Sequence, residues 1–288
     1  MKMTYFSPRG ESLDFTDNPY FWLINVDGLT WAASDISALT IGGVDGDIIN
    51  NIQAQPRGLV FDLRIKQGVN VEDAKRRILR IIKLKQNCNV EWSQNGRTLT
   101  IGGVVEAVEM PRFNNSVTMQ ISIHCPRAFW EDVSEIITEI SAAKNLHYFT
   151  TNPGDMLYFP QAGIPLGEYD TSRTRQFVNE GDVAVGMTIE ILAYSRVTNP
   201  VIYDQNGNFF GVGYAGKPVT LAAGEKIVIN TAAGQKSVTK GNANLLEYIR
   251  PRSTWLQLEA GTNEFSISSD DSTTDNMTFT LIYKQRYV

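Results

Sequence analysis

The sequence has few of the side chains that metal sites and disulfide frameworks use. It contains two cysteines, Cys88 and Cys125, and two histidines, His124 and His147. A structural zinc site takes several Cys or His ligands at short spacings, and no CxxC or HxxxH pattern occurs here. His124 and Cys125 are neighbours on a predicted strand, so they point to opposite faces and are interpreted as structural. We expect no metal site and no disulfide framework.

Long apolar runs are missing as well. No stretch approaches the roughly 18 apolar residues of a membrane span, and the start of the chain lacks the apolar segment of a secretory signal. With 26 Lys and Arg against 31 Asp and Glu, the formal net charge is −5. This charge provides no general attraction to nucleic acid or to anionic membranes. We expect a protein that is made and folded in a cytoplasm and has no membrane partner.

Catalytic and phosphate-binding motifs are also lacking. The sequence contains no GxxxxGK[ST] loop, no GxGxxG, no GxSxG elbow and no HExxH helix, so we expect no catalytic residue and no cofactor. Carboxylate clusters leave a glycoside hydrolase as one alternative; they are Asp155, Glu168 and Asp170, and Asp270, Asp271 and Asp275. The second cluster is typical of a solvated polar hairpin loop, with a calcium or glycosidase site as its alternative reading.

What the chain does contain is β-rich sequence, in a length that suggests two domains. Predicted strands in the first 130 residues are Phe21–Val26, Gly58–Ile65 and Val117–Ile123. Val90–Ile101 predicts a hairpin, because Asn95-Gly96 suits the positive-φ positions of a type I′ turn. The segment Thr-Ile-Gly-Gly-Val occurs at 40–44 and at 100–104, and each copy is read as a strand that ends in a tight turn.

One helix is predicted in this region, from Val71 to Lys85. Asn70 is the expected N-cap, and acidic residues in the first turn suit the helix dipole. One face carries basic residues: Lys75, Arg76, Arg77, Arg80 and Lys83. With an acidic chain and no interleaved aromatics, this face favours solvent or a protein interface over nucleic acid.

Residues 131–154 are predicted to form a linker with a short helix, Val133–Ala143. Beyond it the pattern is all-β, with strands Val183–Tyr194, Val201–Tyr203, Phe209–Val212, Lys226–Asn230, Lys236–Thr239, Trp255–Leu258, Glu264–Ser268 and Met277–Tyr283. Short strands separated by turns such as Asn206-Gly207 predict an antiparallel β-sandwich. The expected fold is mainly β: an α+β N-terminal domain with one helix over 1–130, the linker, and a C-terminal sandwich over 155–288.

Aromatic side chains in the second domain are candidates for stacking on sugars. They are Trp255, Tyr214 and Tyr248. Trp255 lies in an apolar alternation, so a core position is the competing interpretation.

Taken together, the order of these segments resembles the distal tail protein (Dit) family of long-tailed phages that infect Gram-positive bacteria. The stretches that carry the resemblance are Ser7–Phe15, Tyr20–Asp27, Ile121–Trp130, Asn179 with Gly181–Ile191, Asn199–Ile202, Asn206-Gly207, Ala223–Thr231, Ser253–Trp255 and Gly261–Asn263. They touch both predicted domains. Each is a short strand–turn pattern, and their order and spacing matter more than any one of them.

The resemblance implies a structural role in the virion. The family's N-terminal domains form a hexameric ring at the distal end of the tail tube, and its C-terminal sandwiches, galectin-like or like carbohydrate modules, project outward. The ring joins the tail tube to the tail-associated hub protein and docks receptor-binding or baseplate proteins, and DNA passes through its channel without specific binding. The expected location is the virion tail tip, after assembly in the host cytoplasm, and no enzymatic activity is expected.

Within this interpretation the basic helix is the favoured inter-subunit element. Arg76, Arg77, Arg80 and Lys83 are expected to face acidic residues of the next subunit, such as Asp45, Asp47 or Glu109. The main alternative function is a carbohydrate- or receptor-binding module that contacts host-surface glycans.

Overall fold

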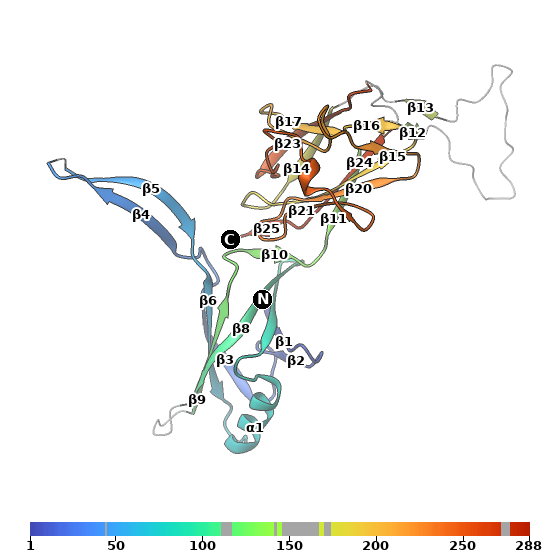
Figure 1. Ribbon diagram of the computed structural model, residues 1–288. Coiled ribbons are helices and arrows are strands. Elements are labelled where there is room, and N and C mark those ends of the chain that lie inside the picture. Colours follow the sequence, from blue (N-terminus) through green and yellow to red (C-terminus); the bar gives the residue numbers. More distant parts are fainter. Residues whose placement is uncertain (44, 111–116, 141–142, 146–166, 170–173, 272–276) are drawn as a thin grey trace, which may run out of the picture. The chain divides into compact units, whose positions relative to one another are not determined.

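The computed structural model describes residues 1–43, 45–110, 117–140, 143–145, 167–169, 174–271 and 277–288. The chain forms two compact units (Figure 1). The N-terminal unit contains Met1–Ser134 together with Arg286–Val288 from the end of the chain. The C-terminal unit contains Glu135–Gln285. The chain therefore passes from the first unit to the second and back again.

The N-terminal unit is built on one antiparallel sheet of nine strands. The strands are β1 (Lys2–Phe6), β2 (Ser12–Asp14), β3 (Phe21–Asp27), β6 (Arg57–Ile65), β7 (Asn87–Gln94), β8 (Arg97–Glu109), β9 (Thr118–Cys125), β10 (Trp130–Asp132) and β25 (Arg286–Tyr287). Their order is β2-β1-β7-β8-β9-β6-β3, and β10 pairs with both β8 and β25. Leu59, Phe61 and Leu63 alternate into the core from β6, as the predicted period of two requires.

The predicted helix is present but shorter than expected. In α1 (Val71–Ile81) the side-chain oxygen of Asn70 accepts hydrogen bonds from the backbone N–H groups two and three residues ahead, at 3.0 and 3.4 Å, which confirms the N-cap. The predicted end at Lys85 is wrong. Ile82 is extended and buried in the core, and the backbone N–H of Lys85 bonds to the carbonyl of Val105 on β8. This pairing with the sheet ends the helix a turn early.

The predicted hairpin between β7 and β8 is confirmed. Asn95 and Gly96 have φ values of 52° and 81°, as a type I′ turn requires. Beside the turn, the hydroxyls of Ser93 and Thr98 are hydrogen-bonded across the strands at 2.9 Å.

The two Thr-Ile-Gly-Gly-Val segments differ in structure. The first follows a strand that ends at Thr40, and Gly43 has a φ of 85°, as a tight turn predicts. The second lies inside β8, so the predicted turn at 100–104 is wrong. A Cβ atom on Gly103 would lie 2.6 Å from Ile123 Cγ2 and 2.9 Å from Cys125 Sγ. Glycine stands in this strand because side chains of β9 occupy the space.

Arg57, the first residue of β6, is a buried cation. Its Nη1 donates to the carbonyl oxygens of Gly28 and Thr30, at 2.6 and 2.5 Å, and its Nε donates to that of Ala128 at 2.9 Å. The guanidinium carbon also lies 5.9 Å from the centre of the Trp130 ring. Burial lowers the pKa of the guanidinium, which is high enough that the group stays charged. One side chain thus holds segments far apart in the sequence.

Between β3 and β6 the chain leaves this sheet. Strands β4 (Ser34–Thr40) and β5 (Asp47–Ala54) pair only with each other, as a two-stranded antiparallel hairpin (Figure 1). We call this hairpin, with the turn between its strands, the arm. Every residue of both strands is exposed.

The C-terminal unit contains two larger antiparallel sheets over a shared core. One sheet consists of β11 (Ile136–Ile140), β15 (Thr188–Ala193), β20 (Lys226–Asn230), β21 (Ser237–Lys240), β22 (Ala243–Asn244) and β24 (Met277–Tyr283), and the other of β14 (Thr174–Asn179), β17 (Val201–Asp204), β18 (Phe209–Gly211) and β23 (Gly261–Ser268). Ile189 and Phe279 of the first sheet lie in one buried cluster with Phe177 and Phe265 of the second. This packing of two sheets confirms the predicted antiparallel sandwich.

Shorter elements complete the unit. They are the pairs β12 (Ala143–Asn145) with β13 (Gly167–Tyr169) and β16 (Val197–Thr198) with β19 (Thr220–Leu221), and a 3₁₀ turn, η1 (Leu246–Tyr248).

Two predicted elements of this region are wrong. The expected helix Val133–Ala143 is replaced by β11, which pairs antiparallel with β24. Its apolar residues recur at helical spacing, but the β-branched run at Ile136 and Ile137 suits a strand, and pairing with β24 decides the outcome. The expected strand Trp255–Leu258 is an extended segment that forms one isolated bridge, from Leu258 to Val185.

The crowding around Gly103 predicts a loss of stability in Gly103→Ala. The new methyl group would overlap side chains of β9, so we expect the free energy of unfolding to fall by about 2 kcal/mol in urea denaturation. Gly58→Ala is the matched control, since nothing lies within 4 Å of a Cβ atom there. Equal stabilities of the two variants would contradict the packing argument.

The buried guanidinium predicts a larger effect in Arg57→Met. This change keeps much of the side-chain volume but leaves three carbonyl oxygens without their donor, so we expect a loss of about 3 kcal/mol. Arg64→Met, at an exposed position of the same strand, should change the free energy of unfolding by no more than about 0.5 kcal/mol. Urea denaturation followed by tryptophan fluorescence measures both, and a stable Arg57→Met variant would disprove the role of the anchor.

Candidate assembly surfaces

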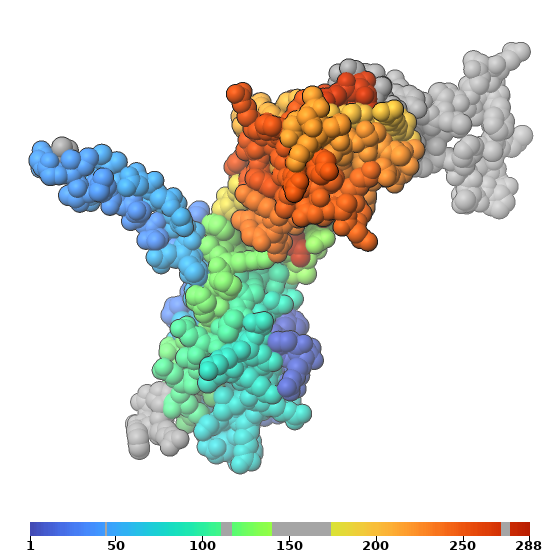
Figure 2. Space-filling model, viewed as in Figure 1, coloured from blue at the N-terminus to red at the C-terminus, as the bar shows by residue number. Residues whose placement is uncertain are grey.

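The arm carries large apolar side chains that no other described segment covers. Its exposed large apolar residues are Ile36, Leu39, Ile41, Ile48, Ile49 and Ile52, each between 41 and 59% exposed. Ile36 pairs with Ile52, and Leu39 pairs with Ile48. Because Ile36 and Leu39 are three residues apart on one strand, these pairs lie on opposite faces of the hairpin. In the space-filling view of Figure 2 the arm is the narrow blue projection, with no other described segment over it on the face in view.

The arm is also acidic. Residues 31–56 include Asp35, Asp45 and Asp47 and contain no Lys or Arg. Asp45 and Asp47 lie where the two strands meet, and both are exposed. The hydroxyl of Thr40 donates to the Asp47 carboxylate at 2.7 Å, across the last pair of the hairpin. We call residues 41–47 the tip, of which Val44 lies outside the described residues.

Three of the four predicted interface residues line one groove on α1. Arg76, Arg77 and Arg80 surround a hollow of about 480 Å³ together with Glu11, Tyr20, Asp73 and Ile81. We call this hollow the arginine groove. Arg77 donates to the Tyr20 hydroxyl at 2.9 Å and its guanidinium carbon lies 4.9 Å from the centre of that ring. Lys83, the fourth predicted residue, is exposed beyond the end of α1 and does not line the groove.

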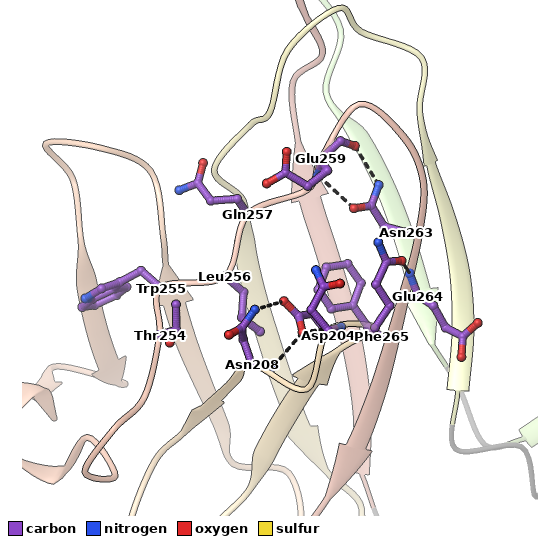
Figure 3. A pocket seen from close by; sticks show the side chains of 12 residues that line it. Asp204, Asn208, Thr254, Trp255, Leu256, Gln257, Glu259, Asn263, Glu264 and Phe265 are labelled. Atoms are coloured by element: carbon purple, nitrogen blue, oxygen red, sulfur yellow. Dashed lines mark hydrogen bonds between the residues drawn. The ribbon is translucent and has the colours of Figure 1, made fainter. Parts of the chain in front are cut away.

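A smaller pocket of about 140 Å³ lies in the C-terminal unit. Trp255 lies at one side of it, and Glu259 and Asn263 lie together at another, joined by two hydrogen bonds (Figure 3). Between them, the Asp204 carboxylate accepts hydrogen bonds from the backbone and side-chain nitrogens of Asn208, both at 2.8 Å. The lining therefore combines two aromatic rings, Trp255 and Phe265, with amides and carboxylates.

The three predicted sugar-stacking residues do not form a single surface. Tyr214 and Tyr248 are associated through Lys217, whose backbone bonds to that of Tyr214 and whose Nζ lies 5.6 Å from the Tyr248 ring centre. Neither tyrosine lines the pocket beside Trp255. Trp255 is half-buried and packs against Phe210, with 4.8 Å between ring centres.

The predicted acidic clusters contribute no site within the described residues. Asp270 accepts a hydrogen bond from Asn199 at 2.7 Å and pairs with Arg250 at 3.4 Å, so its carboxylate has structural partners. Asp155, Asp170 and Asp275 lie outside the described residues, as does the side chain of Glu168. In the part of the chain that the structure describes, no group of three or more His, Cys, Asp and Glu residues is arranged to hold a metal ion.

The two thiols are free and buried in the N-terminal core. Burial raises the pKa of Cys88 to about 11 and that of Cys125 to about 12, so neither is a ready nucleophile at neutral pH. His124, next to Cys125 on β9, is exposed, so the two residues face opposite sides as predicted, and His147 lies outside the described residues. No helix among the described residues is long and apolar enough to span a bilayer.

Sequence reasoning missed the arm as a surface. The signal was present in the isoleucines of 36–52, but their alternation changes phase where the register shifts between Ser37 and Ala38. A strand pattern with a bulge in it is easily read as a loop. The acidic residues of the tip were predicted only as ion-pair partners for the basic helix of the next subunit.

Part of the chain matches a known protein family. Residues 180–287 match the family model of the Dit-type "Siphovirus-type tail component, C-terminal domain". The match covers the C-terminal part of the chain and identifies these residues as similar to the Dit-type tail components. This confirms the resemblance seen in the sequence. A comparison with curated proteins finds no match.

A solved structure extends this likeness to the full length of the chain. This chain resembles the crystal structure of the Dit protein of phage SPP1, described as a paradigm of the hub adsorption apparatus in phages that infect Gram-positive bacteria, with a TM-score of 0.66 and 16% identity over 99% of both chains. It also matches the phage P2 baseplate in its calcium-activated conformation, with a TM-score of 0.45 and 14% identity over 99% of this chain and 97% of that one. The first match shows that the fold is the Dit fold.

Proposed function

We propose that this Dit-family chain forms a hexameric ring at the distal end of a phage tail tube. The observation that carries the proposal is the uncovered arm. A two-stranded hairpin is marginally stable by itself in water, and this one exposes a pair of large apolar side chains on each face. A second copy of the chain that covers the arm satisfies this constraint, and six such contacts in rotation close a ring.

The apolar area of the arm is large enough to matter for assembly. Burying a whole isoleucine side chain stabilises by roughly 1.5–3 kcal/mol, so covering the half-exposed ones of the arm contributes on the order of 1 kcal/mol each. Six such side chains offset a substantial part of the translational and rotational cost of association.

The ring would join the tail tube to the tail-associated hub protein. Receptor-binding or baseplate proteins would dock on it, and DNA would pass through the channel without specific binding. Its place is then the tail tip of the virion, reached by assembly in the host cytoplasm. The membership of residues 180–287 in a tail component family and the Dit fold of the whole chain support these roles. The work of such a ring is done by binding surfaces rather than by catalytic groups.

The native mass in solution tests the ring and the arm together. Six copies of 32.1 kDa give about 193 kDa, which light scattering after size exclusion resolves from a monomer. We expect Ile36→Asp with Ile52→Asp to abolish this species, because the two side chains pair on one face of the arm. The thermal unfolding temperature should not change, since neither residue belongs to a core.

Ser37→Asp with Asn51→Asp is the matched control. These polar residues pair at the next position, on the opposite face, and the same charge is added. The control should assemble like the natural protein. A wild-type chain that stays monomeric at every concentration would reject the ring, and assembly of the isoleucine variant would reject the role of the arm.

A second candidate function, glycan binding by the C-terminal unit, is favoured by the pocket beside Trp255. An aromatic ring next to amides and carboxylates is a lining that suits a sugar, whose ring stacks while its hydroxyls are hydrogen-bonded. The volume of about 140 Å³ suits one sugar unit rather than a long chain.

A glycan array tests this second function. If a cell-wall glycan binds, Trp255→Ala should weaken binding at least about tenfold, which corresponds to about 1.4 kcal/mol. Tyr194→Ala, at an exposed tyrosine that does not line the pocket, should bind like the natural protein. Absence of binding to any glycan, or equal binding by both variants, would exclude this pocket as a sugar site.

A further inference from the structure

The arm and the helix region carry opposite charges. The arm region, residues 31–56, has three aspartates and no basic residue, so its formal charge is −3. Residues 71–85 have six Lys and Arg against Glu72 and Asp73, so their formal charge is +4. Both regions are exposed, so within one copy they do not cover each other. Complementary charge on two uncovered surfaces of one chain favours contact between copies.

The arginine groove has cations that lack a carboxylate partner. Arg76 and Arg80 are one turn apart on the same side of α1, where like charges repel. Among the described residues no ion pair within 4 Å involves either of them, whereas Arg77 is held by Tyr20. A carboxylate placed between the two guanidinium groups would remove the repulsion and accept bidentate hydrogen bonds from them.

The tip has the shape and the charge that the groove requires. A Cβ atom on Gly42, Gly43 or Gly46 would meet nothing within 4 Å, so the tip is slim and surrounded by open space. Asp45 and Asp47 are the charged residues on it, and both are exposed. With seven residues in β4, the arm extends roughly 23 Å at about 3.3 Å per residue. It can therefore reach a neighbouring copy.

Apolar residues flank the charged ones on both surfaces. Ile41 is exposed in the tip and Ile48 next to it, and Leu79 and Leu84 are exposed on and just after α1. A contact between the two surfaces would bury these side chains around the ion pairs. Partial burial would strengthen the ion pairs by excluding water.

We propose that the tip of the arm in one copy, through Asp45 and Asp47, binds the arginine groove of the next copy, through Arg76 and Arg80. The contact rests on the proposed ring and names the residues that close it. Glu109, the other acidic candidate, lies at the end of β8 in the main sheet and is not part of this contact.

A charge exchange between two variants tests the contact. One variant carries Arg76→Glu and Arg80→Glu, and the other carries Asp45→Lys and Asp47→Lys. Each alone should lose the species near 193 kDa, because tip and groove then carry like charges. An equimolar mixture should restore it, since the acidic tip of the first variant meets the unchanged groove of the second, and the lysine tip of the second meets the glutamate groove of the first.

Lys75→Glu with Lys83→Glu is the control, because it makes the same change of net charge outside the groove. This variant should assemble like the natural protein. Assembly by either reversed variant alone, or a mixture that stays monomeric, would overturn the contact. If the control also failed to assemble, the change of net charge would explain the loss, and the proposed contact would be overturned.

Disulfide trapping keeps the contact testable if the natural protein forms no stable ring. Asp45→Cys in one copy and Arg80→Cys in the other should give a cross-linked dimer under mild oxidation, at least about tenfold more than Asp45→Cys mixed with Lys83→Cys. The natural thiols, Cys88 and Cys125, are buried and do not compete. Equal yields in the two mixtures would reject the contact, whereas a specific cross-link without a ring would reject only the hexamer.

Discussion

The buried guanidinium of Arg57 determines how the arm joins the rest of the N-terminal unit. Gly28 and Thr30, whose carbonyls it binds, precede the arm, and Arg57 itself follows the arm by a few residues. Both ends of the arm are therefore tied to one side chain. The same group lies over Trp130 on β10, the strand that pairs with β25 at the end of the chain.

Because Arg57 holds its base, the arm can present an exposed surface although it contributes no residue to the buried core. The position of a hairpin that contributes nothing to the buried core of its own chain depends on the contacts that hold its base. Because Nη1 and Nε of this cation donate to backbone carbonyls rather than to one carboxylate, several segments must be in place at once before these hydrogen bonds form. The fold thus ties down the base of an element whose exposed apolar side chains are covered by another copy in the proposed ring.

Local patterns were sufficient to predict much of this fold, and they failed where distant contacts decide. The Asn95-Gly96 turn and the Asn70 cap depend on neighbours in the sequence, so they could be predicted. Gly103 could not be placed from its neighbours, because the side chains that require a glycine there belong to β9. The segment after Asp132 has helical spacing and became a strand, since β24 offers it an edge to pair with. The arm is the extreme case, because its exposed isoleucines pack against no core within the described residues and are explained only by the second copy that the proposed ring supplies.

The asymmetry of the two assembly surfaces bears on the symmetry of the assembly. Tip and groove are different surfaces of one copy, so a contact between them is heterologous, and each copy keeps one tip and one groove for further copies. A two-fold dimer through this contact would require the tip of each copy to reach the groove of the other copy at the same time. With a fixed arm direction, only one relative orientation of the two copies meets this requirement. In any other orientation the contact repeats from copy to copy, and it closes into a ring where the rotation allows. In the proposed ring, the base held by Arg57 contributes to that rotation, because the direction in which the arm leaves the sheet helps to determine where the next copy lies. The number of subunits in such a ring would then depend on the base of the arm as well as on the tip and groove residues that form the contact.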